Sequence, residues 1–95
     1  MSKPFVMLVD DEAEFIDTTT KRLEKRGLKV LTAYSGKEAL EKVSRNRNLE
    51  VMILDVKMPE MDGLELCSRI RGKQGSRYIY FIIVTTEDVT GEGIG

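Results

Sequence analysis

Two kinds of apolar pattern alternate along the chain. Short apolar runs, typical of buried strands, cover residues 5–9, 28–33, 49–54 and 78–85. Between them lie three segments in which apolar residues recur every three or four positions, as on one face of a helix. The predicted order is strand, helix, strand, helix, strand, helix, strand. Such alternation favours an α/β fold, a parallel sheet with covering helices and right-handed crossovers.

The ends of the predicted helices carry recognisable signals. Gly27 stands where the glycine that ends a helix belongs, after a helical pattern that begins at Ala13. Ser35 and Glu38 have the spacing of a capping box at the start of the second helix. Asp62 is a candidate N-cap for the third helix. The apolar stripe of that third helix is predicted to consist of Leu64, Cys67 and Ile70.

Polar residues follow three of the predicted strands. Asp10 and Asp11 come after the first, Asp55 ends the third, and Thr85 ends the fourth. The carboxyl ends of parallel strands meet at one edge of a sheet, where ligands bind near the point at which the strand order reverses. We therefore expect these four side chains to gather at one edge.

Three carboxylates at one edge repel one another. At an effective dielectric constant of about 20, two like charges about 4 Å apart cost roughly 4 kcal/mol. Such a cluster persists if some members are protonated or if a cation lies among them. Oxygen ligands without nitrogen or sulfur favour a hard ion, Mg²⁺ above all, and Mg²⁺ readily binds phosphate oxygens. The pattern therefore predicts a site for phosphoryl transfer.

The composition excludes several other kinds of functional site. The 95 residues suit one small domain, and they include no histidine and one cysteine, Cys67. Histidine-dependent zinc sites and Ser-His or Cys-His nucleophiles are therefore excluded. The net charge of −1 offers no basic field for nucleic acid. The apolar runs are too short for a bilayer, and the amino terminus lacks a signal-peptide pattern. We expect a cytoplasmic protein.

Three motifs, together with the order of elements, carry a resemblance to a known family. The chain resembles a receiver domain of the bacterial two-component response regulator family, from Phe5 to about Glu87. The matching residues are Val9-Asp10-Asp11-Glu12, Ile53-Leu54-Asp55-Val56-Lys57-Met58-Pro59-Glu60-Met61-Asp62-Gly63 and Val84-Thr85-Thr86-Glu87. The resemblance implies a flavodoxin-like sheet with helices on both faces, and a signalling role as a phosphoacceptor rather than as an enzyme.

The resemblance also implies a role for each site residue. Asp55 resembles the phosphoacceptor, which takes a phosphoryl group from a phosphohistidine of a sensor histidine kinase. Asp11 resembles a direct Mg²⁺ ligand, and Asp10 a ligand that acts largely through water. The backbone carbonyl of Lys57 would complete the protein's share of the coordination, together with Asp55. Thr85 resembles the switch hydroxyl that turns toward the new phosphoryl group.

Two features depart from the family pattern. Thr86 occupies a position at which the family usually has Ala or Gly. In addition, no lysine follows Lys73, although the family has one near the end of the domain. We therefore expect a C-terminally truncated receiver over residues 1–87, a tail over residues 88–95, and four strands with three helices. An edge strand without a neighbour favours self-association.

Other functions fit less well. Magnesium-dependent aspartyl phosphatases have a second Asp two residues after the first, where this chain has Lys57. A flavin-binding protein would need a glycine- and hydroxyl-rich loop after the first strand, where this chain has acids. The remaining alternative is a receiver-like interaction module in which phosphorylation no longer acts as a switch.

Overall fold

Each predicted strand and helix is present, in the predicted order. The fold is described from a computed structural model, which covers residues 3–73 and 78–84. The strands are β1 (Phe5–Val9), β2 (Lys29–Ala33), β3 (Val51–Asp55) and β4 (Tyr80–Val84). The helices are α1 (Ala13–Lys25), α2 (Gly36–Arg45) and α3 (Gly63–Lys73). The strands form one parallel sheet in the order β2-β1-β3-β4. The predicted α/β fold is therefore confirmed.

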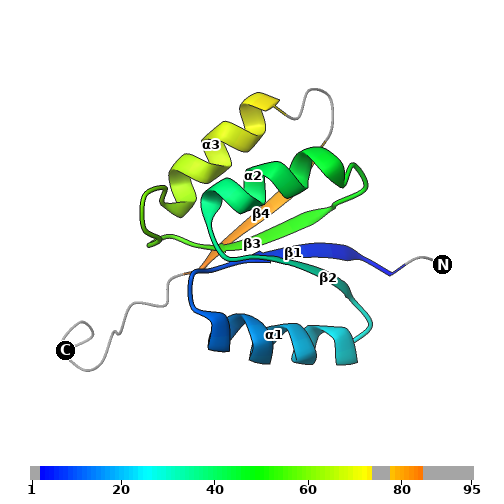
Figure 1. Ribbon diagram of the computed structural model, residues 1–95. Coiled ribbons are helices and arrows are strands. Elements are labelled where there is room, and N and C mark those ends of the chain that lie inside the picture. Colours follow the sequence, from blue (N-terminus) through cyan, green and yellow to red (C-terminus); the bar gives the residue numbers. More distant parts are fainter. Residues whose placement is uncertain (1–2, 74–77, 85–95) are drawn as a thin grey trace, which may run out of the picture.

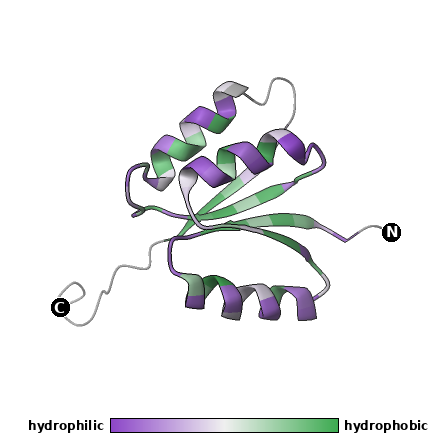
Figure 2. Cartoon of the chain, viewed as in Figure 1, coloured by the Kyte–Doolittle hydropathy of each residue, from purple (hydrophilic) through white to green (hydrophobic). Residues whose placement is uncertain are grey.

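The helices lie in two layers on opposite sides of the sheet (Figure 1). Helix α1 covers one face, and α2 and α3 lie side by side over the other. The strands are the most apolar part of the chain, and each helix carries polar residues on its outer side (Figure 2). This is the arrangement expected when a parallel sheet has to be buried on both faces.

The core between the sheet and the α2–α3 layer is built from one row of side chains. The strand register places Met7 beside Leu31 on one side and beside Met52 on the other, and Met52 beside Phe81. Met7 and Met52 have no exposed surface, and burying a side chain of this size contributes about 1.5–3 kcal/mol. The row crosses all four strands, so it holds β1 and β3 in the fixed register on which the site depends.

The predicted helix ends are confirmed by their hydrogen bonds. Gly27 has a positive φ of 91°, and the amides of Gly27 and Leu28 donate to the carbonyls of Glu24 and Leu23, which is a Schellman motif. The amide of Glu38 donates to Ser35 Oγ at 3.1 Å. The carboxylate of Glu38 accepts a hydrogen bond from the amide of Tyr34 at 2.8 Å.

Asp62 also acts as predicted at the start of α3. Its Oδ1 accepts a hydrogen bond from the amide of Glu65 at 2.8 Å. The predicted apolar stripe was wrong at Leu64, which is 59% exposed. Leu66 and Ile70, one turn apart, are the residues fully buried against the core. Cys67, the third residue of the predicted stripe, is half-buried and packs against the core.

Three strands begin later than predicted. Leu28 belongs to the turn that ends α1, and β2 starts one residue after it. Leu49 is buried, but its amide donates to the carbonyl of Asn46 in a turn, so β3 starts at Val51. β4 starts at Tyr80. The predicted tail over residues 88–95 lies outside the described residues. Among the described helices, none is long and apolar enough to cross a membrane.

Candidate functional site

The sheet order places the carboxyl ends of β1 and β3 next to each other, in the middle of the edge formed by the strand ends. From β1 the chain goes to β2 on one side, and β3 then takes the other side of β1. The strand order therefore reverses between β1 and β3, which is where ligands bind in open parallel sheets. Val9 is the register partner of Leu54. Asp10, which follows Val9, and Asp55, which follows Leu54, therefore leave the sheet side by side.

The three predicted carboxylates come together at this edge. Asp10, Asp11 and Asp55 each offer a carboxylate oxygen, and these oxygens all lie within 4.8 Å of one another. Asp10 is fully buried and Asp55 is 2% exposed, whereas Asp11 is exposed. The predicted convergence of these residues is confirmed. Thr85 lies outside the described residues, directly after Val84, and its role stays a prediction.

Asp10 shows the electrostatic cost of this arrangement. Its Oδ1 accepts a hydrogen bond from the amide of Glu12 at 3.0 Å, while its Oδ2 is buried and has no hydrogen-bond partner among the described residues. Burial, together with the nearby carboxylates of Asp55 and Asp11, raises the pKa of Asp10 from its ordinary value of 3.8 to about 6. Near neutral pH the buried group therefore carries a charge that its protein neighbours do not compensate.

A divalent cation fits these residues. The three donors are carboxylate oxygens, which hard ions such as Mg²⁺ and Ca²⁺ prefer. Asp10 also has a buried oxygen, Oδ2, with no hydrogen-bond partner among the described residues. A cation there would supply the missing partner and offset the repulsion between the carboxylates. The arrangement can therefore hold a metal ion at the end of β3, with an exposed carboxylate on its outer side.

The loop that follows β3 is held close to the site. Asp55 Oδ1 accepts a hydrogen bond from the amide of Lys57 at 3.3 Å, and the amide of Val56 donates to the carbonyl of Val84 at 3.1 Å. Met58 is buried in the core and anchors this loop. Glu60 has a positive φ of 70°, which turns the chain back toward α3.

Gly63 has a positioning role that the sequence did not reveal. Its amide donates to the carbonyl of Val56 at 2.9 Å. A Cβ atom at Gly63 would lie 2.3 Å from the backbone oxygen of Asp55, closer than real Cβ atoms come. The start of α3 can therefore approach the end of β3 only because residue 63 is glycine. The available signal was a glycine directly after the capping Asp62, which also suits an ordinary turn.

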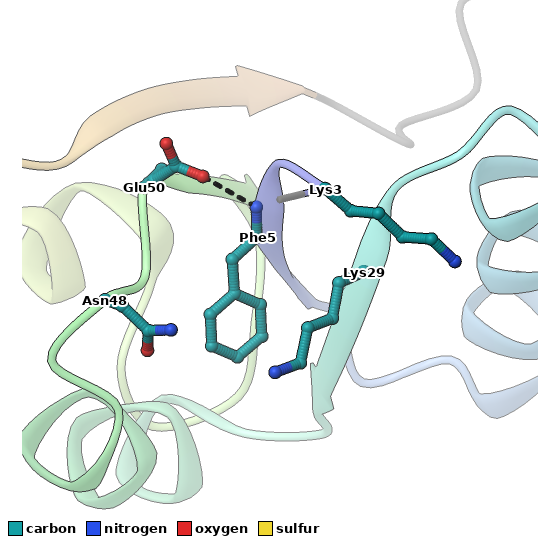
Figure 3. A pocket seen from close by; sticks show the side chains of 5 residues that line it. All are labelled: Lys3, Phe5, Lys29, Asn48 and Glu50. Atoms are coloured by element: carbon teal, nitrogen blue, oxygen red, sulfur yellow. Dashed lines mark hydrogen bonds between the residues drawn. The ribbon is translucent and has the colours of Figure 1, made fainter. Parts of the chain in front are cut away.

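A separate hollow of about 430 Å³ lies at the opposite edge of the sheet, where the strands begin (Figure 3). It is lined by Lys3, Phe5, Lys29, Asn48 and Glu50. The amide of Phe5 donates to the Glu50 carboxylate at 2.8 Å, and the Lys29 ammonium lies 4.5 Å from the centre of the Phe5 ring. These contacts cover the amino ends of the strands with solvated charges, and they are remote from the three aspartates.

Comparisons with known proteins agree with this geometry. The sequence profile of the response regulator receiver domain matches residues 6–93. The chain is 35% identical over 86 residues to the response regulator SaeR of Staphylococcus aureus. It is 36% identical over 66 residues to the alkaline phosphatase synthesis transcriptional regulatory protein PhoP of Bacillus subtilis. The alignment with SaeR covers 90% of the chain, and the alignment with PhoP covers 70%.

Solved structures of receiver proteins share the fold. The chemotaxis protein CheY4 of Vibrio cholerae superposes with a TM-score of 0.83 and 32% identity, over 92% of this chain and 72% of that one. A response regulator receiver protein of Pseudomonas putida superposes with a TM-score of 0.81 and 27% identity, over 94% of this chain and 74% of that one. The alignments span only 37% of SaeR and 27% of PhoP, so the chain corresponds to a minor part of those curated relatives.

The raised pKa of Asp10 predicts that the metal-free chain loses stability as the pH rises. Between pH 3.8 and about 6 the folded state binds more protons than the unfolded state, so the free energy of unfolding falls with pH. The stabilisation present below this window is lost above it, and it amounts to up to about 3 kcal/mol. Urea unfolding in the presence of a chelator, at a series of pH values, measures the change.

Asp10→Asn should remove this loss, and it should make the metal-free chain more stable than the wild type at neutral pH. Asp17→Asn, a change on the exposed side of α1, should keep the wild-type profile. If the unfolding free energies of the wild type and Asp10→Asn changed in parallel with pH, the loss of stability could not be assigned to Asp10.

Gly63→Ala should weaken cation binding as well as stability, because the added methyl group pushes α3 away from the end of β3. Overpacking of this kind costs about 1–3 kcal/mol. Gly72→Ala, near the other end of the same helix, is the matched control, because its added Cβ meets nothing within 4 Å. Urea unfolding and Mg²⁺ titration calorimetry measure the two effects. Wild-type values for Gly63→Ala in both experiments would contradict the positioning role.

Proposed function

The chain belongs to the response regulator receiver domain family, the phosphoacceptor domains of two-component systems, and we propose that Asp55 is its phosphoacceptor. The observation that carries this assignment is the place of Asp55. It is the last residue of β3, at the point where the strand order reverses. One of its carboxylate oxygens lies within 4.8 Å of a carboxylate oxygen of each of the two aspartates that follow β1. Phosphoryl transfer needs positioning and charge neutralisation more than any other help from the protein.

The proposed reaction transfers a phosphoryl group from a phosphohistidine to Asp55. A carboxylate oxygen of Asp55 attacks the phosphorus atom, and the bond between phosphorus and the donor's imidazole nitrogen breaks. The bonding electrons stay with that nitrogen, and the product on this chain is an aspartyl phosphate. These 95 residues include no histidine, so the proposed donor imidazole lies outside them. We propose a sensor histidine kinase as the donor and assign the chain an acceptor role rather than an enzymatic one.

We propose Mg²⁺ as the cation, held by Asp10, Asp11, Asp55 and the backbone carbonyl of Lys57. When bound, it would supply positive charge that offsets the charge of the carboxylates and of the incoming phosphoryl group. The unpartnered Oδ2 of Asp10 and the all-oxygen donor set support this choice. The amide of Lys57 already donates to Asp55, and this hydrogen bond orients the acceptor carboxylate.

We propose Thr85 as the hydroxyl that binds the phosphoryl group and reports its presence. The support comes from the strand register, in which Asp55 is the partner of Val84, the residue before Thr85. A further proposed partner is a second copy of the chain, bound through the outer edge of β4. We place the domain in the cytoplasm, which agrees with a single free cysteine.

Incubation with Mg²⁺ and acetyl phosphate should add one phosphoryl group to the chain, because the acceptor and the cation site are both present. Intact-mass spectrometry measures the gain. Asp55→Asn should abolish it, and so should a chelator. Asp17→Asn is the control that removes a carboxylate outside the cluster, and it should phosphorylate normally. A phosphoryl group that persists in Asp55→Asn, or no gain in a folded wild-type chain, would overturn the assignment.

A further inference from the structure

The loop between β3 and α3 contains a strained turn. The amide of Met61 donates to the carbonyl of Pro59 at 2.7 Å, and Glu60 between them has a positive φ of 70°. This hydrogen bond and this φ are those of a γ-turn of the rarer, strained kind. A residue with a Cβ atom adopts such a φ at a cost, and the conformation persists only where surrounding contacts hold the chain in place. Residues outside the turn must therefore help to hold it.

Met61 makes the contact that holds the end of this turn. Pro59 and Glu60 are exposed, whereas Met61 is half-buried and packs against the core. Its side chain lies against the first residue of α2, where a Cβ atom added at Gly36 would be 2.9 Å from Met61 Sδ and 3.1 Å from Met61 Cβ. The start of α2 lies beside this loop (Figure 1). Met61 thus occupies the space that a side chain at residue 36 would take.

This space, rather than the backbone, explains why residue 36 is glycine. Gly36 is the first residue of α2, directly after the N-cap Ser35, and its φ is not positive. In helices alanine is favoured over glycine, so neither the helix nor the cap requires glycine here. Gly36 is also buried, and a methyl group there would have to displace Met61. The glycine therefore admits the side chain of Met61.

We propose that Met61, packed against Gly36, positions the loop that carries Lys57, and that α2 thereby influences cation binding at the end of β3. Lys57 and Met61 belong to the same short loop, between the last residue of β3 and the first residue of α3. The inference rests on the proposed function, because the carbonyl of Lys57 is a ligand only in the proposed Mg²⁺ site. It adds a positioning role for two residues outside the cluster of aspartates.

The loop is fixed to the rest of the molecule on both sides of the strained turn. Before the turn, Met58 is buried in the core, and the amide of Lys57 donates to Asp55 Oδ1 at 3.3 Å. After the turn, Met61 packs against Gly36. Without this second contact the strained φ of Glu60 would relax, and the backbone on either side would move with it. The direction of the Lys57 carbonyl and the hydrogen bond to Asp55 both depend on this backbone.

Gly36→Ala should weaken Mg²⁺ binding by about two- to tenfold, because the new methyl group displaces Met61. Met61→Ala should weaken it as well, since the shortened side chain no longer fills the space above Gly36. Titration calorimetry of the folded chain measures the affinity, and urea unfolding measures the stability of each variant. Val43→Ala is the matched control, because Val43 is buried near the other end of the same helix. It should lose stability and keep the wild-type affinity for Mg²⁺.

Combining the two changes tests whether Gly36 acts through Met61. Of the three Met61 atoms that a Cβ at residue 36 would meet, Sδ and Cγ are absent from Met61→Ala. The loss of affinity caused by Gly36→Ala should therefore be smaller in the Met61→Ala background than in the wild type, as expected for residues in contact. Two losses that add in full would overturn the proposal.

Amide NMR of the metal-free chain tests the position of the loop without relying on cation binding. The amide signal of Lys57 should shift in Gly36→Ala and in Met61→Ala, and it should stay in place in Val43→Ala. A wild-type chain that bound no Mg²⁺ would contradict the proposed cation site, and this comparison would still decide the positioning role. An unmoved Lys57 signal in both variants, wild-type Mg²⁺ affinity in both, or an equal loss of affinity in Val43→Ala would overturn the proposal.

Discussion

The sheet holds three carboxylates together at one edge against their mutual repulsion. Asp10 and Asp55 are almost completely buried, and their charges would separate if the backbone allowed it. The backbone does not allow it, because β1 and β3 are neighbours in the centre of the sheet and their register is set by the core beneath them. Burial raises the pKa of Asp10, the neighbouring carboxylates of Asp55 and Asp11 raise it further, and its Oδ2 has no hydrogen-bond partner among the described residues. A divalent cation among these carboxylates would offset their repulsion.

The surrounding structure keeps Asp55, the proposed acceptor, in place. Gly63 lets the start of α3 approach the carbonyl of Asp55, and Met58 anchors the intervening loop in the core. The amide of Lys57 holds one oxygen of the acceptor carboxylate. Each of these contacts restrains the end of β3 from a different direction. Phosphoryl transfer depends on such positioning, since the protein supplies no acid or base of its own in the proposed reaction.

The sequence predicted those parts of the structure that depend on local chemistry or on strand ends. The aspartates were placed correctly because parallel strands bring their carboxyl ends to one edge, and Ser35, Gly27 and Asp62 act as the caps that their residue types favour. Leu64 was misplaced, because periodicity alone does not show which side of a short helix faces the sheet. The site role of Gly63 was not predicted, because a glycine directly after a capping Asp also suits an ordinary turn and does not by itself indicate a close backbone approach.

The central claim is that the carboxylates at the ends of β1 and β3 form one divalent-cation site. Titration with Mn²⁺ in place of Mg²⁺, followed by amide NMR, measures it directly, because the paramagnetic ion broadens the signals of nearby nuclei. The account predicts early broadening at Asp10, Asp11, Asp55 and Lys57, with the signals of Lys29 and Glu50 at the opposite edge of the sheet unaffected. Broadening centred elsewhere, or no selective broadening in the folded chain, would contradict it.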